Sequence, residues 1–100
     1  MNIALDYDDT YTRDPEFWNR FINMCWVKGH YVCICTCRGD NEHERIKLVE
    51  SGDIITDRVP VFYTDGQAKR EYMTRVGGIL IHVWIDDMPD LILEGPIAIG

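Results

Sequence analysis

The chain alternates between short apolar runs and longer segments in which apolar residues recur at helical spacing. The apolar runs have the length of strands and few charged residues, which is typical of strands buried on both faces of a sheet. Five such runs lie at residues 2–5, 31–36, 59–63, 79–85 and 97–99. The intervening segments predict helices at residues 15–28, 41–51 and 66–76, and a helical turn at 88–93.

The first of these helices has the clearest end signals. Asp14 is a typical N-cap, Pro15 suits the first helical position, and Glu16 places a negative charge in the first turn. Gly29 follows the last apolar position and favours a left-handed cap. We therefore expect a well-defined helix between the first two strands.

Strands that alternate with helices in this way indicate repeated βαβ units. The predicted fold class is α/β, with a three-layer, doubly wound, Rossmann-like parallel sheet of about five strands. The run at 79–85 is continuous and apolar, so we expect it near the centre of the sheet. The length of 100 residues suits one domain, so we expect residues 1–100 to form a single catalytic core.

Composition narrows the class of protein. Hydrophobic residues make up 46% and charged residues 27%, with a net charge of -7, as in globular proteins that fold in water. No apolar run reaches the ~20 residues of a membrane span, and no signal peptide is evident, so we expect a cytoplasmic protein with no membrane partner. The acidity argues against a general nucleic-acid binder, because phosphate backbones need a basic surface.

The four cysteines fit this compartment. Cys33, Cys35 and Cys37 alternate along one predicted strand, which places them on one face at a spacing unsuited to disulfides. They do not form the paired pattern of a zinc site. Together with Cys25 they are best interpreted as small apolar core residues in a reducing cytosol.

Chemically useful residues follow the predicted strands. Ligands of open α/β sheets bind beyond the carboxyl ends of the strands. The residues at those ends, or at the start of the helix after the third strand, are Asp6, Asp8, Asp9, Thr10, Thr36, Arg38, Lys69, Asp86, Asp87 and Asp90. Carboxylates this close stay ionised only beside a positive charge, which Lys69 and a divalent cation would supply. Hard oxygen ligands suit Mg²⁺, and this set suits phosphoryl transfer.

These residues resemble the motifs of the haloacid dehalogenase-like (HAD) superfamily, most of whose members are Mg²⁺-dependent phosphatases. The four motifs are an apolar strand followed by D-x-D-x-T, here Ile3 to Thr10; a Thr that ends a strand, in the form T-x-R, here Thr36 and Arg38; a Lys at a helix start, here Lys69; and an acidic pair after a strand, here Asp86 with Asp87 or with Asp90. They occur in the family order. Ile85 and Cys37 stand where many members have Gly.

The resemblance implies a role for each of these positions. Asp6 would be the nucleophile that forms a phosphoaspartate, and Asp8 would be the general acid and base. Thr36, Lys69 and Arg38 would bind the phosphate, although Arg38 could instead pair with a surface acid. Mg²⁺ would be held by Asp6, the Asp8 carbonyl, Asp86, and either Asp87 or Asp90. Asp9 and Thr10 are interpreted as residues of the turn.

The resemblance also suggests a minimal member without a cap domain. The segment from Tyr11 to Arg13 and residues 38–68 are too short to hold one. The leading hypothesis is hydrolysis of a small phosphorylated metabolite or nucleotide. The alternatives are a phosphorylated macromolecule, such as a nucleic-acid end or a protein, and a catalytically silent binding protein. Exposed aromatic residues allow a homo-oligomer that covers the site.

Two other chemistries fit the pattern less well. A response-regulator receiver also uses Mg²⁺ and a phosphoaspartate, but its phosphorylated Asp follows the third strand. Asp65 is the only candidate there, and the order is wrong, because Thr36 comes before Asp65 and an acidic pair follows Lys69. A nuclease built on clustered acids would leave Thr36 and Lys69 unexplained.

Overall fold

The computed structural model describes residues 1–39, 41 and 59–93. The strands are β1 (Asn2–Leu5), β2 (Tyr31–Thr36), β3 (Val61–Tyr63) and β4 (Val83–Ile85). The helices are α1 (Pro15–Val27), α3 (Lys69–Tyr72) and α4 (Asp90–Leu93), with a 3-10 turn η1 (Tyr11–Arg13) and a π-helix η2 (Met73–Gly77). The predicted helix at 41–51 and the predicted strand at 97–99 lie outside the described residues, apart from position 41.

The four described strands form one parallel sheet in the order β3-β2-β1-β4. The register pairs Leu5 with both Ile34 and Ile85, so β1, β2 and β4 end at nearly the same level. The α/β class and the parallel sheet predicted from the pattern are thereby confirmed. All carboxyl ends of these strands point to the same edge of the sheet.

The predicted central position of the fourth strand is wrong among the described strands. β4 pairs with β1 alone and begins at Val83 rather than at residue 79. Residues 79–82 find other backbone partners: Ile79 N–H bonds to the Met73 carbonyl, and the Asn2 side chain donates to the Leu80 carbonyl. The apolar character of β4 comes from packing on both faces of the sheet, which an edge strand also experiences.

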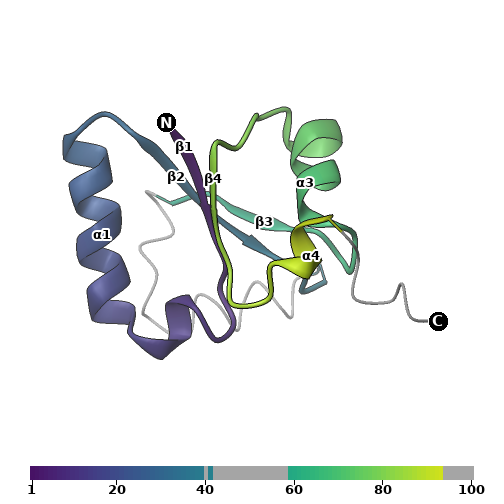
Figure 1. Cartoon of the computed structure of the whole chain (residues 1–100), viewed down its shortest axis with the longest axis horizontal. Coiled ribbons are helices and arrows are strands. Elements are labelled where there is room, and N and C mark those ends of the chain that lie inside the picture. The colour runs from purple at the N-terminus through teal and green to yellow at the C-terminus, as the bar shows by residue number, and fades with distance from the viewer. Residues whose placement is uncertain (40, 42–58, 94–100) are drawn as a thin grey trace.

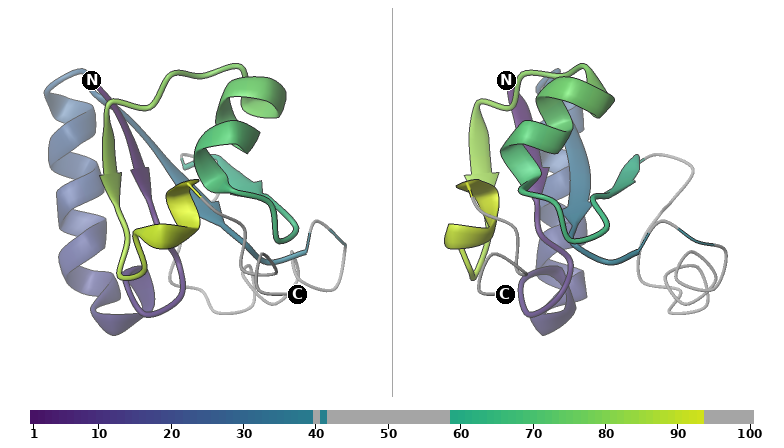
Figure 2. Two further views of the ribbon diagram at one scale, coloured as in Figure 1. Left: turned by 45° about the vertical axis from the view of Figure 1, so that its right-hand side comes forward. Right: turned by 90° about the vertical axis from the view of Figure 1, so that its right-hand side faces the viewer.

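Two apolar clusters cover opposite faces of the sheet. Alternation along the strands directs Ile3, Leu5, Val32 and Ile34 to the face covered by α1. The intervening Ala4, Cys33 and Cys35 pack with Met73 of η2 on the other face. Figure 1 and both views of Figure 2 show α1 and α3 on opposite sides of the strands. The described chain therefore has three layers.

Three of the four cysteines are core residues, as the pattern predicts, whereas Cys37 lies beyond the end of β2 and is only partly buried. All four are free, and Cys25, Cys33 and Cys35 are buried. Burial raises the pKa of the Cys33 thiol to about 12 and raises that of Cys35 as well. These thiols are core residues, since a buried thiol that stays protonated is neither a nucleophile nor a metal ligand.

The helix ends differ in how closely they follow the prediction. Asp14 caps α1 by accepting the Phe17 N–H at 3.1 Å, and Gly29 follows the helix at φ 81°, both as predicted. The third helix begins at Lys69 instead of residue 66. Asp65 and Gly66 adopt left-handed backbone angles, φ 53° and 78°, which a right-handed helix does not accept.

The connection between β1 and α1 is short and fully described. It consists of a turn at residues 7–10 and η1, so no cap domain is inserted there. The second place considered for a cap, between Thr36 and Lys69, lies partly outside the described residues. No helix in the described part of the chain is long and apolar enough to cross a membrane.

We expect Ile34→Ala to lower the free energy of unfolding by about 2–5 kcal/mol, because Ile34 is fully buried between β1, β3 and α1. Val27→Ala, on the exposed end of α1, should change it by about 0.5 kcal/mol or less. Urea unfolding monitored by circular dichroism measures both values. Losses of equal size at the two positions would contradict this description of the core.

Candidate functional site

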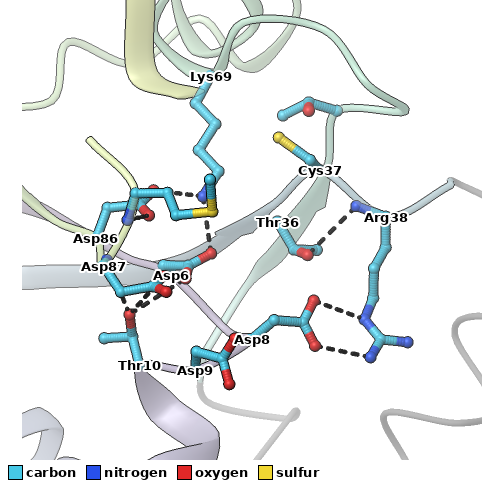
Figure 3. A network of polar contacts seen from close by, with 12 residues as sticks. Asp6, Asp8, Asp9, Thr10, Thr36, Cys37, Arg38, Lys69, Asp86 and Asp87 are labelled. Atoms are coloured by element: carbon cyan, nitrogen blue, oxygen red, sulfur yellow. Dashed lines mark hydrogen bonds and ion pairs between the residues drawn. The ribbon is translucent and has the colours of Figure 1, made fainter. Parts of the chain in front are cut away.

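The site lies at the carboxyl edge of the sheet, where segments far apart in sequence meet. Asp6 directly follows β1, Thr36 ends β2, and Asp86 directly follows β4. The Asp6 N–H bonds to the Ile85 carbonyl at 2.9 Å, which fixes the two acidic segments side by side. Figure 3 shows these side chains together with Lys69, which arrives from the start of α3.

Lys69 lies between two carboxylates inside the protein. Its Nζ donates to Asp6 Oδ1 at 2.7 Å and to Asp86 Oδ2 at 2.5 Å. The exposed fractions of the three side chains are 1% for Lys69, 8% for Asp6 and 2% for Asp86. A buried ammonium with two buried carboxylates is the most strongly coupled group of charges in the described chain, because little water screens them.

Burial and charge act in opposite directions on these groups. Burial raises the pKa of Asp6 to about 6, against the lowering effect of Lys69 and with a further raising effect from Asp87 and Asp86. Burial alone would lower the pKa of Lys69, but hydrogen bonds and charges from Asp6 and Asp86 raise it above its ordinary value. Lys69 therefore stays positively charged, and Asp6 sits in a place that favours added positive charge.

Thr10 connects the first and fourth acidic segments. Its hydroxyl lies 3.1 Å from Asp6 Oδ2 and 3.4 Å from Asp87 Oδ1, and it accepts the Asp87 N–H at 3.2 Å. Thr10 was expected only in the turn, so this contact was missed. The signal was present, because Thr10 is the hydroxyl residue of the D-x-D-x-T motif.

Asp8 and Arg38 form a second, more exposed pair at the same edge. Arg38 donates from Nε to Asp8 Oδ2 at 3.0 Å and from Nη2 to Asp8 Oδ1 at 2.8 Å. The Arg38 guanidinium also lies over the Tyr7 ring, 5.4 Å from its centroid. Of the two partners considered for Arg38, an acid or the substrate, the structure shows an acid, and that acid belongs to the site itself.

Thr36 contacts the outer pair from the end of β2. It is almost fully buried, and its Oγ1 accepts the Arg38 backbone N–H at 3.3 Å. Its carbonyl accepts the Thr64 N–H at 2.8 Å, so the ends of β2 and β3 are held together. The Thr36 hydroxyl is thereby fixed at the strand end from which the sequence predicts a phosphate contact.

Three carboxylates are close enough to share a metal ion. Oxygen atoms of Asp6, Asp86 and Asp87 all lie within 4.8 Å of one another. Lys69 neutralises one of three ionised carboxylates, so two negative charges remain, which matches a divalent cation. Carboxylate oxygens are the donors that Mg²⁺ prefers, so the donor set fits. Asp90 is exposed at the start of α4 and is not in this group.

Comparisons of the chain with protein-family models, curated proteins and solved structures give no match. The functional interpretation therefore depends on the four motifs and on the site geometry. The structure brings together Asp6, Lys69, Asp86 and Asp87, and places Asp8, Arg38 and Thr36 beside them.

We expect Lys69→Met to lower the free energy of unfolding by about 3–5 kcal/mol at pH 7.5, because it leaves two buried carboxylates without a counter-charge. The pKa of Asp6 already lies above its usual range, and losing Lys69 raises it further. The native state then holds protons that the unfolded chain releases above about pH 4. The loss of stability should therefore be largest above pH 6 and shrink as the pH falls toward 4.

Urea unfolding of the wild type and Lys69→Met at several pH values tests this expectation. Arg70→Met is the matched control, since it removes the neighbouring but exposed positive charge. If Lys69→Met loses no more stability than Arg70→Met, or if its loss does not depend on pH, the buried ion pairs of Lys69 with Asp6 and Asp86 do not stabilise the fold as described.

Proposed function

We propose that the protein is a Mg²⁺-dependent phosphomonoester hydrolase of the HAD-like type, without a cap, acting through a phosphoaspartate on Asp6. The substrate we propose is a small phosphorylated metabolite or nucleotide. One observation carries the proposal: the buried Lys69 ammonium joins Asp6 and Asp86 at the strand ends, beside Thr36. Positive charge and hydroxyl donors in this arrangement stabilise the negative charge on the oxygens of a phosphoryl group while it is transferred.

Asp6 is suited to be the nucleophile. Lys69 holds one of its oxygens and Thr10 the other, so the carboxylate has a fixed direction. A nucleophile held in place avoids part of the entropy cost of the reaction. Lys69 has two acceptors among the described residues for its three N–H groups, so one can bind a phosphate oxygen together with the Thr36 hydroxyl.

The proposed reaction has two steps with Asp8 as acid and then base. First, an Asp6 oxygen bonds to phosphorus, the bond from phosphorus to the leaving oxygen breaks, and Asp8 gives that oxygen a proton. Second, water bonds to phosphorus and gives a proton to Asp8, while the bond from phosphorus to Asp6 breaks. The products are an alcohol and inorganic phosphate, and both carboxyl groups return to their starting state.

Asp6, Asp86 and Asp87, with the Asp8 carbonyl, are the residues we propose to hold Mg²⁺. A bound Mg²⁺ supplies positive charge that stabilises the phosphate oxygens during transfer. The short connection from β1 to α1 leaves this edge uncovered by any insertion after the first motif. The net charge of -7 disfavours a polynucleotide substrate, which supports the small-molecule assignment.

We expect the protein to hydrolyse p-nitrophenyl phosphate in the presence of Mg²⁺, and Asp6→Asn to reduce the rate by at least about 10³-fold, since it removes the nucleophile. Asp9→Asn is the matched control, because Asp9 lies exposed in the same turn with its backbone bonded to Thr12. It should retain activity. Hydrolysis can be followed by the absorbance of p-nitrophenol.

A panel of phosphorylated metabolites and nucleotides would then define the substrate. Activity that survives Asp6→Asn would reject the nucleophile. Absence of turnover on the whole panel, with phosphate still bound, would favour the silent binding protein. Turnover of phosphorylated proteins or nucleic-acid ends alone would favour the macromolecular alternative.

We also expect Mg²⁺ to raise the thermal unfolding midpoint of the wild type, because the ion binds only the folded site. Asp86→Asn and Asp87→Asn should each reduce this shift, since both side chains belong to the carboxylate group. Asp90→Asn should leave it unchanged, which provides a control of equal charge. Thermal scans with and without Mg²⁺ measure the shifts. A shift lost in Asp90→Asn but kept in Asp87→Asn would reverse the assignment of the second acid.

A further inference from the structure

The proposed reaction needs both Asp8 and Arg38 at this edge, but in this structure the two side chains bind each other in a bidentate pair. Both Asp8 oxygens accept hydrogen bonds from Arg38, so neither is directed to a leaving group. We propose that Arg38 is an exchangeable anion site, which holds Asp8 until a phosphate group of the substrate replaces it on the guanidinium. This inference rests on the proposed function and adds a coupling between substrate binding and release of Asp8.

Arg38 is the fixed member of the pair. Its guanidinium lies over the ring of Tyr7, which is buried and stacked on Tyr11 with centroids 5.9 Å apart. Its backbone N–H is bound by the hydroxyl of the buried Thr36. These contacts hold Arg38 from its main chain and from one face of its guanidinium, and none of them depends on Asp8.

Asp8 is the member that can leave. Its side chain is 50% exposed, against 30% for Arg38, and its polar side-chain contacts within the described part of the chain are with Arg38. A partly exposed ion pair contributes little to stability, because water and salt screen its charges. Water can solvate the released carboxylate, so replacing it on the guanidinium carries a small cost.

A phosphate group fits the position that Asp8 would vacate. The Nε and Nη2 donors of a guanidinium bind two oxygens of a phosphate in the same way as two oxygens of a carboxylate. In the view of Figure 3, the Thr36 hydroxyl and the Asp8 carboxylate lie between Asp6 and the Arg38 guanidinium. A phosphate approaching Asp6 and Thr36 therefore meets Arg38 from the side that Asp8 now fills.

The exchange has a consequence for the order of events. Asp8 stays on Arg38 while the site is empty, and the arriving phosphate frees it beside the leaving oxygen. The group that we propose as acid and base is then freed together with substrate binding, and it takes from water the proton that it gives to the leaving oxygen. Arg38 is on this account a positioning residue for Asp8 as well as a contact for the phosphate.

A double-mutant cycle on phosphate binding tests the exchange without measuring turnover. The four proteins are the wild type, Asp8→Asn, Arg38→Gln and the double variant, titrated with inorganic phosphate in the presence of Mg²⁺ at constant ionic strength. Phosphorus NMR can detect weak binding, and thermal unfolding checks that each variant is folded. Asp9→Asn controls for loss of one negative charge in the same turn.

We expect Asp8→Asn to raise the affinity for phosphate about fivefold when Arg38 is present, because the guanidinium no longer has a competitor. In the Arg38→Gln background, Asp8→Asn should change the affinity for phosphate less than about twofold. The control Asp9→Asn should also change it less than about twofold, with or without Arg38. An equal gain with and without Arg38 would show general repulsion and overturn the exchange, while phosphate binding would leave the proposed function standing. No phosphate binding by any of the proteins would reject both.

Discussion

The site depends on burial of the Lys69 ammonium between two carboxylates. Buried charges are tolerated only when they are paired and hydrogen-bonded, and Lys69 meets that condition through Asp6 and Asp86. The carboxyl ends of β1 and β4 and the first residue of α3 must therefore lie at the same place. The parallel sheet provides this, because its strands end at the same edge and η2 anchors the α3 side through the buried Met73.

Two groups of polar residues with different exposure share this edge. The inner group, around Lys69, is buried and hydrogen-bonded, and its geometry suits a nucleophile and a metal ion. The outer group, Asp8 with Arg38, is more exposed, which suits the exchange of partners that we propose. Thr36 touches the outer group from the buried end of β2. The division into a buried inner and a more exposed outer part fits the two-step phosphoryl transfer that we propose.

Much of the inner group could be predicted from the sequence, because alternation of strands and helices determines which residues follow strands. Asp6 and Asp86 follow strands and Lys69 begins the helix after the third strand, so that pattern indicates all three, as it does Thr36 at the end of β2. The position of β4 at the edge of the described sheet could not be predicted, since an apolar run indicates that both faces of a strand are buried but not where the strand lies in the sheet. The Asp8–Arg38 pair and the bridging of Thr10 depend on side-chain direction across loops, which spacing in the sequence does not determine. The late start of α3 depends on two left-handed backbone angles.

The contacts of Lys69 also bear on how the chain folds. Its partners lie 63 residues earlier and 17 residues later in the sequence. Neither contact can form from local structure, and each requires closure of a long segment of chain, which is slow compared with helix formation. Until β1 and β4 have paired, water remains the best solvent for both carboxylates. We therefore expect the charged centre to form only once β1 and β4 have paired, so that an intact Lys69 contact marks a chain that has completed its topology.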